Sequence, residues 1–209
     1  MIFTAPLSES PAFDFPLTGF VLAGGKSSRM GRDKALLFLR DRYLIQYPIQ
    51  VLHHVTADVR IIGDPKKYDF LELPVIADCA ESKGPLTGIY TALRVSGSSF
   101  NLIVGCDMPK ISLRFLHLLL AKTGHADVVI MKFDNGLVEP LCALYSQGCL
   151  PAIEENFRQH RYKISDLFSI VEVEYVLESE IRKLGLTRDI FTNINTMEDW
   201  ETWEAENPG

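Results

Sequence analysis

Residues 17–34 read LTGFVLAGGKSSRMGRDK, an apolar run followed by two adjacent glycines and four cationic residues. The apolar run Leu17–Ala23 predicts a buried strand, which ends at Gly24 and Gly25. Two adjacent glycines let the backbone turn sharply and approach a ligand closely. Successive backbone N–H groups in such a turn form a concavity that binds anions. The strand and its turn therefore predict a binding loop at the carboxyl end of a strand.

Cations follow the two glycines at positions 26, 29, 32 and 34, in a chain whose net charge is −6. A polyphosphate matches this density of donors, with Arg29 binding as a planar fork and Lys34 as a mobile point charge. The spacing fits neither GxGxxG nor the Walker loop, so a solvated turn with incidental charges is the alternative for this loop considered alone.

Outward from this loop, short apolar runs alternate with longer amphipathic ones. We expect strands at residues 59–62, 73–76, 102–105, 128–132 and 137–145, and helices at residues 45–54, 85–95, 113–121, 150–159, 178–184 and 196–206. This alternation is typical of βαβ units on a largely parallel sheet. We therefore predict an α/β fold, a single Rossmann-like three-layer domain over residues 17–209. Three prolines in residues 1–16 predict a flexible N-terminal arm.

The composition excludes several classes of protein. A net charge of −6 argues against a nucleic-acid binder, which usually has a basic surface. No apolar run reaches the roughly 18 residues of a membrane span, and no signal peptide is apparent. The four cysteines form neither a CxxC pair nor a zinc pattern, so we expect reduced, mostly buried thiols. We expect a cytoplasmic protein with no membrane association.

Asp107 follows the apolar run at residues 102–105, within the sequence Cys106-Asp107-Met108-Pro109. A carboxylate at the end of a strand is well placed to bind Mg²⁺, which takes one or two carboxylates together with substrate phosphates. A turn or helix-capping aspartate is the structural alternative. Because ligands of open α/β sheets bind beyond the carboxyl ends of the strands, we expect Asp107 and the glycine-rich loop to share one site.

The string LAGGKSSRMGRDK, residues 22–34, closely resembles the signature loop of molybdenum cofactor guanylyltransferases, and sugar-nucleotide and cytidylyl transferases share a looser version of it. The resemblance extends in order through Asp78 with the Gly84-Pro85-Leu86 segment, Cys106–Pro109, residues 138–145 and residues 193–199. Residues 18–203 are thus covered. The chain departs from the family at Gly63, where the family often has an asparagine that touches the nucleotide, and at Met197, where proline is usual.

The resemblance implies a nucleotidyltransferase fold and a set of site residues. Arg29, Lys34 and Asp107 would be catalytic, and Asp107 would bind Mg²⁺. The nucleotide would bind to Leu22, Ala23, Gly24, Gly25, Lys34, Asp78, Gly84 and Asp107, and the acceptor side would include Glu139, Asn193 and Asn195.

Three of these assignments have structural alternatives. Glu139 could face the acceptor side, or it could be a turn glutamate that precedes a proline. Asp78 could accept hydrogen bonds from the N1–H and exocyclic amine of guanine, or it could cap the following helix. Asn195, considered by itself, is better interpreted as the cap of the last helix, and Thr196 with Asp199 also resembles a capped helix start.

The implied reaction is transfer of GMP from GTP to the phosphate of molybdopterin or the molybdenum cofactor, with release of pyrophosphate. Cofactor-assembly proteins and molybdoenzymes would be transient partners. Three alternatives remain: the use of CTP, a sugar phosphate as acceptor, or a non-catalytic module that binds guanine nucleotides.

Overall fold

Strand β1 (Leu17–Leu22) occupies the centre of the fold. In the computed structural model, which describes residues 15–24, 33–79 and 84–206, β1 pairs in parallel with both β4 (Val59–Ile62) and β6 (Phe100–Gly105). The sheet has seven strands in the order β5-β4-β1-β6-β8-β7-β9. The remaining four strands are β5 (Val75–Ile76), β7 (Val128–Lys132), β8 (Val138–Ser146) and β9 (Val173–Leu177).

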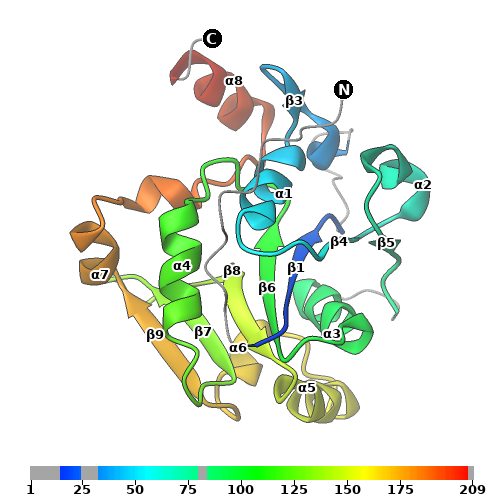
Figure 1. The fold of residues 1–209 in the computed structure, drawn as a ribbon, viewed down its shortest axis with the longest axis vertical. Helices are drawn as coiled ribbons and strands as arrows, with labels where there is room; N and C mark the ends of the chain where they lie inside the picture. The colour runs from blue at the N-terminus through cyan, green and yellow to red at the C-terminus, as the bar shows by residue number, and fades with distance from the viewer. Residues whose placement is uncertain (1–14, 25–32, 80–83, 207–209) are drawn as a thin grey trace.

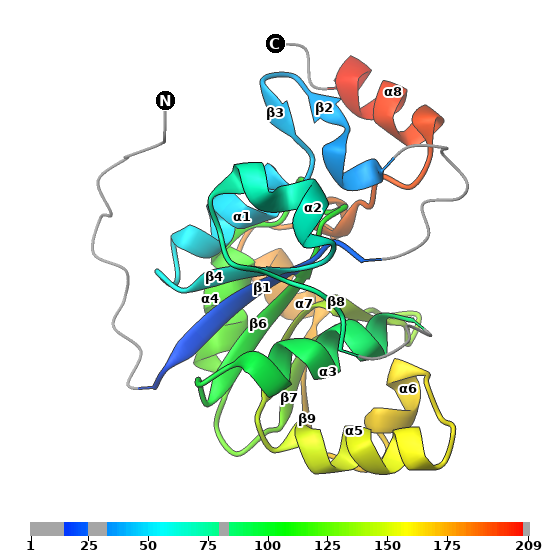
Figure 2. The same ribbon diagram turned by 90° about the vertical axis from the view of Figure 1, so that its right-hand side faces the viewer.

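Helices cover both faces of this sheet, which makes three layers (Figures 1 and 2). One face packs against α1 (Gln46–His53) and α4 (Leu113–Ala121), and the other packs against α3 (Pro85–Val95), α5 (Cys149–Arg158) and α6 (Ile164–Leu167). Alternate residues of β1 enter the two cores, since Val21 belongs to one and Phe20 to the other. Burial on both faces explains the continuous apolar run of a central parallel strand.

Strand β8 runs against the other strands of the sheet. It pairs antiparallel with β6 and β7, and the predicted Asp134–Gly136 turn joins it to β7. The first residues of β8 therefore lie at the same sheet edge as the carboxyl ends of β1 and β6. The mostly parallel α/β sheet predicted from the sequence is confirmed.

A small second layer lies above this edge. A two-stranded hairpin, β2 (Phe38–Leu39) and β3 (Arg42–Tyr43), packs beside α8 (Met197–Glu206), as Figure 2 shows. Trp203 and Ile194 share a buried cluster with hairpin residues. The short helix η1 (Lys34–Leu36) precedes β2, so this layer also fixes the start of the segment that carries Lys34.

Several elements differ from the prediction. The strand expected at residues 73–76 is shorter, and β9 and the β2–β3 hairpin were not predicted. Five short helices of the described residues were also not predicted: η1, α6, α2 (Pro65–Tyr68), η2 (Asp69–Leu71) and η3 (Arg188–Phe191). The predicted helix at residues 178–184 is α7 (Glu178–Lys183).

The four cysteines all carry free thiols, and three of them are buried, as expected. No described helix is both long and apolar enough to cross a bilayer. Residues 1–14 of the predicted N-terminal arm lie outside the described residues, so its flexibility stays a prediction.

Candidate active site

A cavity of about 640 Å³ opens at the carboxyl ends of β1, β4 and β6. It lies at the topological switch point of the sheet, next to β1, where the order of the strands along the chain changes direction. This is the usual ligand site of open α/β folds. Its lining includes residues predicted from three separate sequence segments: Leu22, Gly24, Lys34, Asp78, Gly84 and Asp107. The structure thus brings the glycine-rich strand end and the acidic turn into one cavity.

Lys34 and Asp107 face each other in this cavity. The Lys34 Nζ atom lies 2.6 Å from Asp107 Oδ2, and it also donates to Asn195 Oδ1 at 3.1 Å. The side chains of Lys34 and Asp107 are 26% and 13% exposed, so both remain accessible from the cavity. Asp33 precedes Lys34 and caps η1 by accepting a hydrogen bond from the Ala35 N–H. A cation from the segment that follows β1 and a carboxylate from the turn that follows β6 therefore share one polar centre.

The backbone holds Asp107 in place from two sides. The Cys106 N–H donates to the Leu22 carbonyl at 3.1 Å, and the Ile194 N–H donates to the Asp107 carbonyl at 2.9 Å. Gly105 is required here, because a Cβ atom at that position would lie 2.6 Å from Asp107 Oδ1. Gly105 was not predicted as a site residue, although its place directly before Cys106 and Asp107 was the available signal.

Asp78 is held by Thr91, a residue inside helix α3, and does not cap the start of that helix. The Thr91 hydroxyl lies 2.9 Å from Asp78 Oδ1, and the Cys79 N–H donates to Thr91 Oγ1 at 3.2 Å. The N-cap position of α3 is Gly84, with no side-chain cap, so the helix-capping alternative for Asp78 is wrong. The second carboxylate oxygen, Oδ2, lies 3.4 Å from the position of a Cβ on Gly24. Thr91 is fully buried, and no motif in the sequence pointed to it.

The structure of the segment before α8 shows that one prediction, the residue that caps this helix, was wrong. Thr196, and not Asn195, caps this helix: Asp199 N donates to Thr196 Oγ1 at 3.1 Å, and Asp199 Oδ2 accepts from Thr196 N at 2.8 Å. The Asn195 side chain is instead directed to Lys34. Asn193 Oδ1 is buried and accepts no hydrogen bond from the described residues. The Thr196–Asp199 cap is confirmed, while the cap role favoured for Asn195 is wrong.

Glu139 lies near Asp107 because β8 begins at the cavity edge. Burial raises the pKa of Glu139 to about 7, the Leu141 N–H that it accepts at 3.2 Å acts in the opposite direction, and the negative charge of Asp107 raises it further. Leu141, and not Glu139, contributes to the cavity lining. Cys106 is also affected, since burial raises the pKa of its thiol to about 12 and keeps it protonated.

Comparisons with known proteins agree with this geometry. Residues 19–173 match the model of a family described as the MobA-like NTP transferase domain. The chain belongs to this family. A probable molybdenum cofactor guanylyltransferase of Pelotomaculum thermopropionicum is 38% identical over 87% of this chain and 89% of its own length. The molybdenum cofactor guanylyltransferase of Syntrophotalea carbinolica is 30% identical over 90% of this chain and 91% of its own length.

Solved structures support the same MobA-like assignment. Molybdopterin-guanine dinucleotide biosynthesis protein A from Archaeoglobus fulgidus is 26% identical and superposes with a TM-score of 0.77, covering 90% of this chain and 97% of its own. A 4-diphosphocytidyl-2C-methyl-D-erythritol synthase from Anaerococcus prevotii has a TM-score of 0.68 at 12% identity, over 91% of this chain and 95% of its own, and so shares the fold. The predicted family is confirmed.

Two predicted residues of the MobA-like loop, Gly25 and Arg29, lie outside the described residues, so their contacts with the nucleotide stay predictions. Ala23 is described, and its backbone N–H donates to the Ile62 carbonyl at 2.8 Å.

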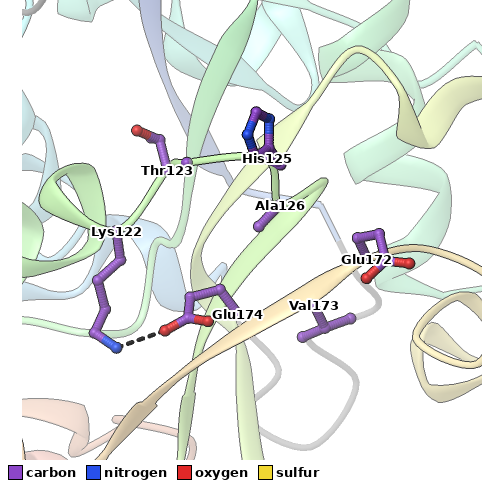
Figure 3. A pocket seen from close by; sticks show the side chains of 8 residues that line it. Lys122, Thr123, His125, Ala126, Glu172, Val173 and Glu174 are labelled. Carbon is purple, nitrogen blue, oxygen red and sulfur yellow. Dashed lines mark hydrogen bonds and ion pairs between the residues drawn. The ribbon is translucent and has the colours of Figure 1, made fainter.

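A second cavity, of about 330 Å³, is lined by residues at the opposite sheet edge, where β7 and β9 begin (Figure 3). There Lys122 Nζ donates to Glu174 Oε1 at 2.6 Å, and Glu180 Oε1 lies 3.3 Å from the same Nζ atom. The charge of Lys122 is therefore compensated, and none of the predicted MobA-like site residues lines this cavity.

Proposed function

We propose that this protein transfers GMP from GTP to the terminal phosphate of molybdopterin or its molybdenum-loaded form, releasing pyrophosphate and forming the guanine dinucleotide. The observation that supports this most strongly is the 2.6 Å contact between Lys34 and Asp107 in a cavity also lined by Gly24 and Asp78. The names of the relatives support GTP and the molybdenum cofactor as substrates, and the cavity contains a cation and a carboxylate of the kind that such a reaction uses.

The transfer breaks the bond between the α-phosphorus and the oxygen that bridges to the β-phosphate, and it forms a bond from an acceptor phosphate oxygen to the α-phosphorus. Such reactions depend mainly on positioning and on neutralising charge. Among the described residues that line the cavity, Lys34 is the cationic one. Its ammonium group would stabilise negative charge as pyrophosphate leaves. The acceptor phosphate is already ionised at neutral pH, so the transfer requires no general base from the protein.

Asp107 fits a magnesium ion. Its Oδ2 contacts Lys34, whereas its Oδ1 accepts no hydrogen bond from the described residues and lies against Gly105. The described residues contain no group of three or more His, Cys, Asp or Glu side chains that could hold a metal. Substrate phosphate oxygens and water would complete the coordination, as is usual for Mg²⁺. When bound, the ion would supply Lewis-acid stabilisation of phosphate charge.

Asp78 is our candidate for recognition of guanine. Thr91 holds one carboxylate oxygen, and the other faces Gly24 at the cavity wall. The Asp78 carboxylate can accept hydrogen bonds from the N1–H and amine of guanine, whereas cytosine does not present this pair of donors. Asn195, which contacts Lys34, and the nearby Asn193 and Glu139 would form the acceptor side.

The test is pyrophosphate release with molybdopterin, Mg²⁺ and each of GTP, CTP, ATP and UTP. We expect release with GTP, and a folded Asp107→Asn variant should show none. Faster release with CTP would show that the base assignment is wrong. Binding of GTP without release would instead favour a non-catalytic module.

A further inference from the structure

Tyr68, at the end of α2, is 1% exposed and lies outside every motif identified in the sequence. Its hydroxyl has one proton, which it shares between two acceptors: the Ala23 carbonyl at 3.1 Å and Asp33 Oδ2 at 3.0 Å. These two acceptors are ten residues apart in the sequence, and they directly precede Gly24 and Lys34. Since both Gly24 and Lys34 line the cavity, one buried hydroxyl connects the two chain segments that deliver them.

The ring of Tyr68 reaches this position because residue 63 is glycine. A Cβ atom on Gly63 would lie 2.8 Å from Tyr68 Cε2, closer than carbon atoms can pack, and 3.4 Å from the Ala23 Cβ. Gly63 follows β4 directly, and its N–H donates to the Ile76 carbonyl at 2.9 Å. An aromatic ring from α2 thus fills the space into which a side chain at position 63 would point.

The hydroxyl of Tyr68 keeps its proton. Burial and the negative charge of Asp33 raise the pKa of Tyr68 well above its usual range, so the hydroxyl is protonated and can donate at neutral pH. Lys67 also contacts Asp33 Oδ2 at 2.8 Å, but Lys67 is 51% exposed, and solvent weakens such an ion pair. The buried hydroxyl is therefore the stronger constraint on Asp33.

We propose that Tyr68 is a positioning residue: by joining Ala23 to Asp33 it fixes Gly24 and Lys34 relative to each other, and so sets the affinity of the cavity for triphosphate. This inference rests on the proposed function, because it takes the cavity to bind the phosphates of GTP. Tyr68 itself does not need to touch the substrate.

The experiment compares Tyr68→Phe with Tyr47→Phe. Tyr47 donates to the Leu39 carbonyl at 2.9 Å in the β2–β3 layer, so the control loses a similar hydrogen bond outside the cavity. Thermal unfolding without ligand and calorimetric binding of Mg²⁺·GTP are measured for both. We expect similar losses of thermal stability, whereas only Tyr68→Phe weakens GTP binding, by up to about tenfold, the limit when the whole contribution of one hydrogen bond is coupled to binding. Unchanged binding by Tyr68→Phe, or equal weakening in both variants, would overturn the inference.

Magnesium tripolyphosphate serves as a second probe, because it presents phosphates without a base. If the wild-type protein binds tripolyphosphate but not GTP, the proposed function fails, while the same order of variants on tripolyphosphate still supports the role of Tyr68. Binding of neither probe by the wild type overturns both proposals.

Gly63→Ala gives an independent check, since its Cβ must displace the Tyr68 ring. We expect Gly63→Ala to weaken triphosphate binding as much as Tyr68→Phe does, and the double variant to weaken it no further. Full additivity of the two effects would show that position 63 does not act through the hydroxyl of Tyr68.

Discussion

Glu139→Gln should stabilise the protein at alkaline pH, and the size of this effect follows from the position of Glu139. Its pKa is raised from an ordinary value of 4.5 to about 7, mainly by burial. The folded state then holds a proton that the unfolded chain releases at lower pH. Between these two values the folded state binds more protons, so the free energy of unfolding of the wild type falls as pH rises. At about 1.4 kcal/mol for each pH unit, the full loss is about 3 kcal/mol.

Denaturant unfolding at pH 5 and pH 8 measures this directly. Glutamine cannot ionise, so the free energy of unfolding of Glu139→Gln, taken relative to wild type, should rise by about 2–3 kcal/mol between pH 5 and pH 8. Glu201→Gln, at an exposed position on α8, is the matched control and should show almost no change.

A second variant tests the nearness of Asp107. The charge of Asp107 contributes to the raised pKa of Glu139, so in an Asp107→Asn background the pH-dependent gain from Glu139→Gln should become smaller. A pH-independent effect of Glu139→Gln, or an equal pH dependence in Glu201→Gln, would refute the burial of an ionisable group at the start of β8.

Three further outcomes are expected. Lys34→Met should lower kcat for pyrophosphate release by about 10²–10³-fold, the usual loss for one preorganised donor, as measured in steady-state assays; a loss below fivefold would remove Lys34 from the reacting centre. Thr91→Val should reduce the free energy of unfolding by about 1–3 kcal/mol, because the Cys79 N–H and Asp78 Oδ1 lose their shared partner. The same variant should reduce the ratio of the KM for inosine triphosphate to the KM for GTP, and Thr91→Ser should restore that ratio. An unchanged ratio in Thr91→Val would show that Asp78 does not recognise the base.

The central part of the fold could be predicted from the sequence because its strands are buried on both faces. The helix Pro85–Val95 and the strands Val59–Ile62 and Val128–Lys132 have the predicted bounds. Strand β9 was not predicted, although Val173 and Tyr175 alternate with glutamates, because half-exposed strands leave a weaker apolar signal.

The β2–β3 hairpin was not predicted for a different reason. Each of its strands has two residues, and its turn places Arg40 at φ 60°, where glycine or asparagine would have been the recognisable signal. This layer is stabilised by contacts with Trp203 and Ile194, which lie more than 150 residues further along the chain. Such long-range packing is absent from local sequence patterns.

The candidate site was predicted in part. Motifs placed Lys34, Asp78 and Asp107 in one cavity, because the carboxyl ends of parallel strands meet at one edge. Two supporting residues were missed. Thr91, which contacts Asp78, lies on a buried helix and in no motif, and Tyr68, which contacts Asp33, is the buried residue of the otherwise exposed four-residue helix α2. The side chain of Asn195 was assigned to the wrong partner, since Thr196 beside it was an equally good cap.

Calorimetric titration of GTP with and without Mg²⁺ tests most directly whether Lys34 and Asp107 form one site for a metal-bound triphosphate. We predict that Mg²⁺ strengthens GTP binding to the wild type, that Asp107→Asn loses this gain, and that Lys34→Met binds GTP more weakly under both conditions. An Asp107→Asn variant that keeps the full gain from Mg²⁺ would contradict the assignment of Asp107 as the metal ligand of a shared site.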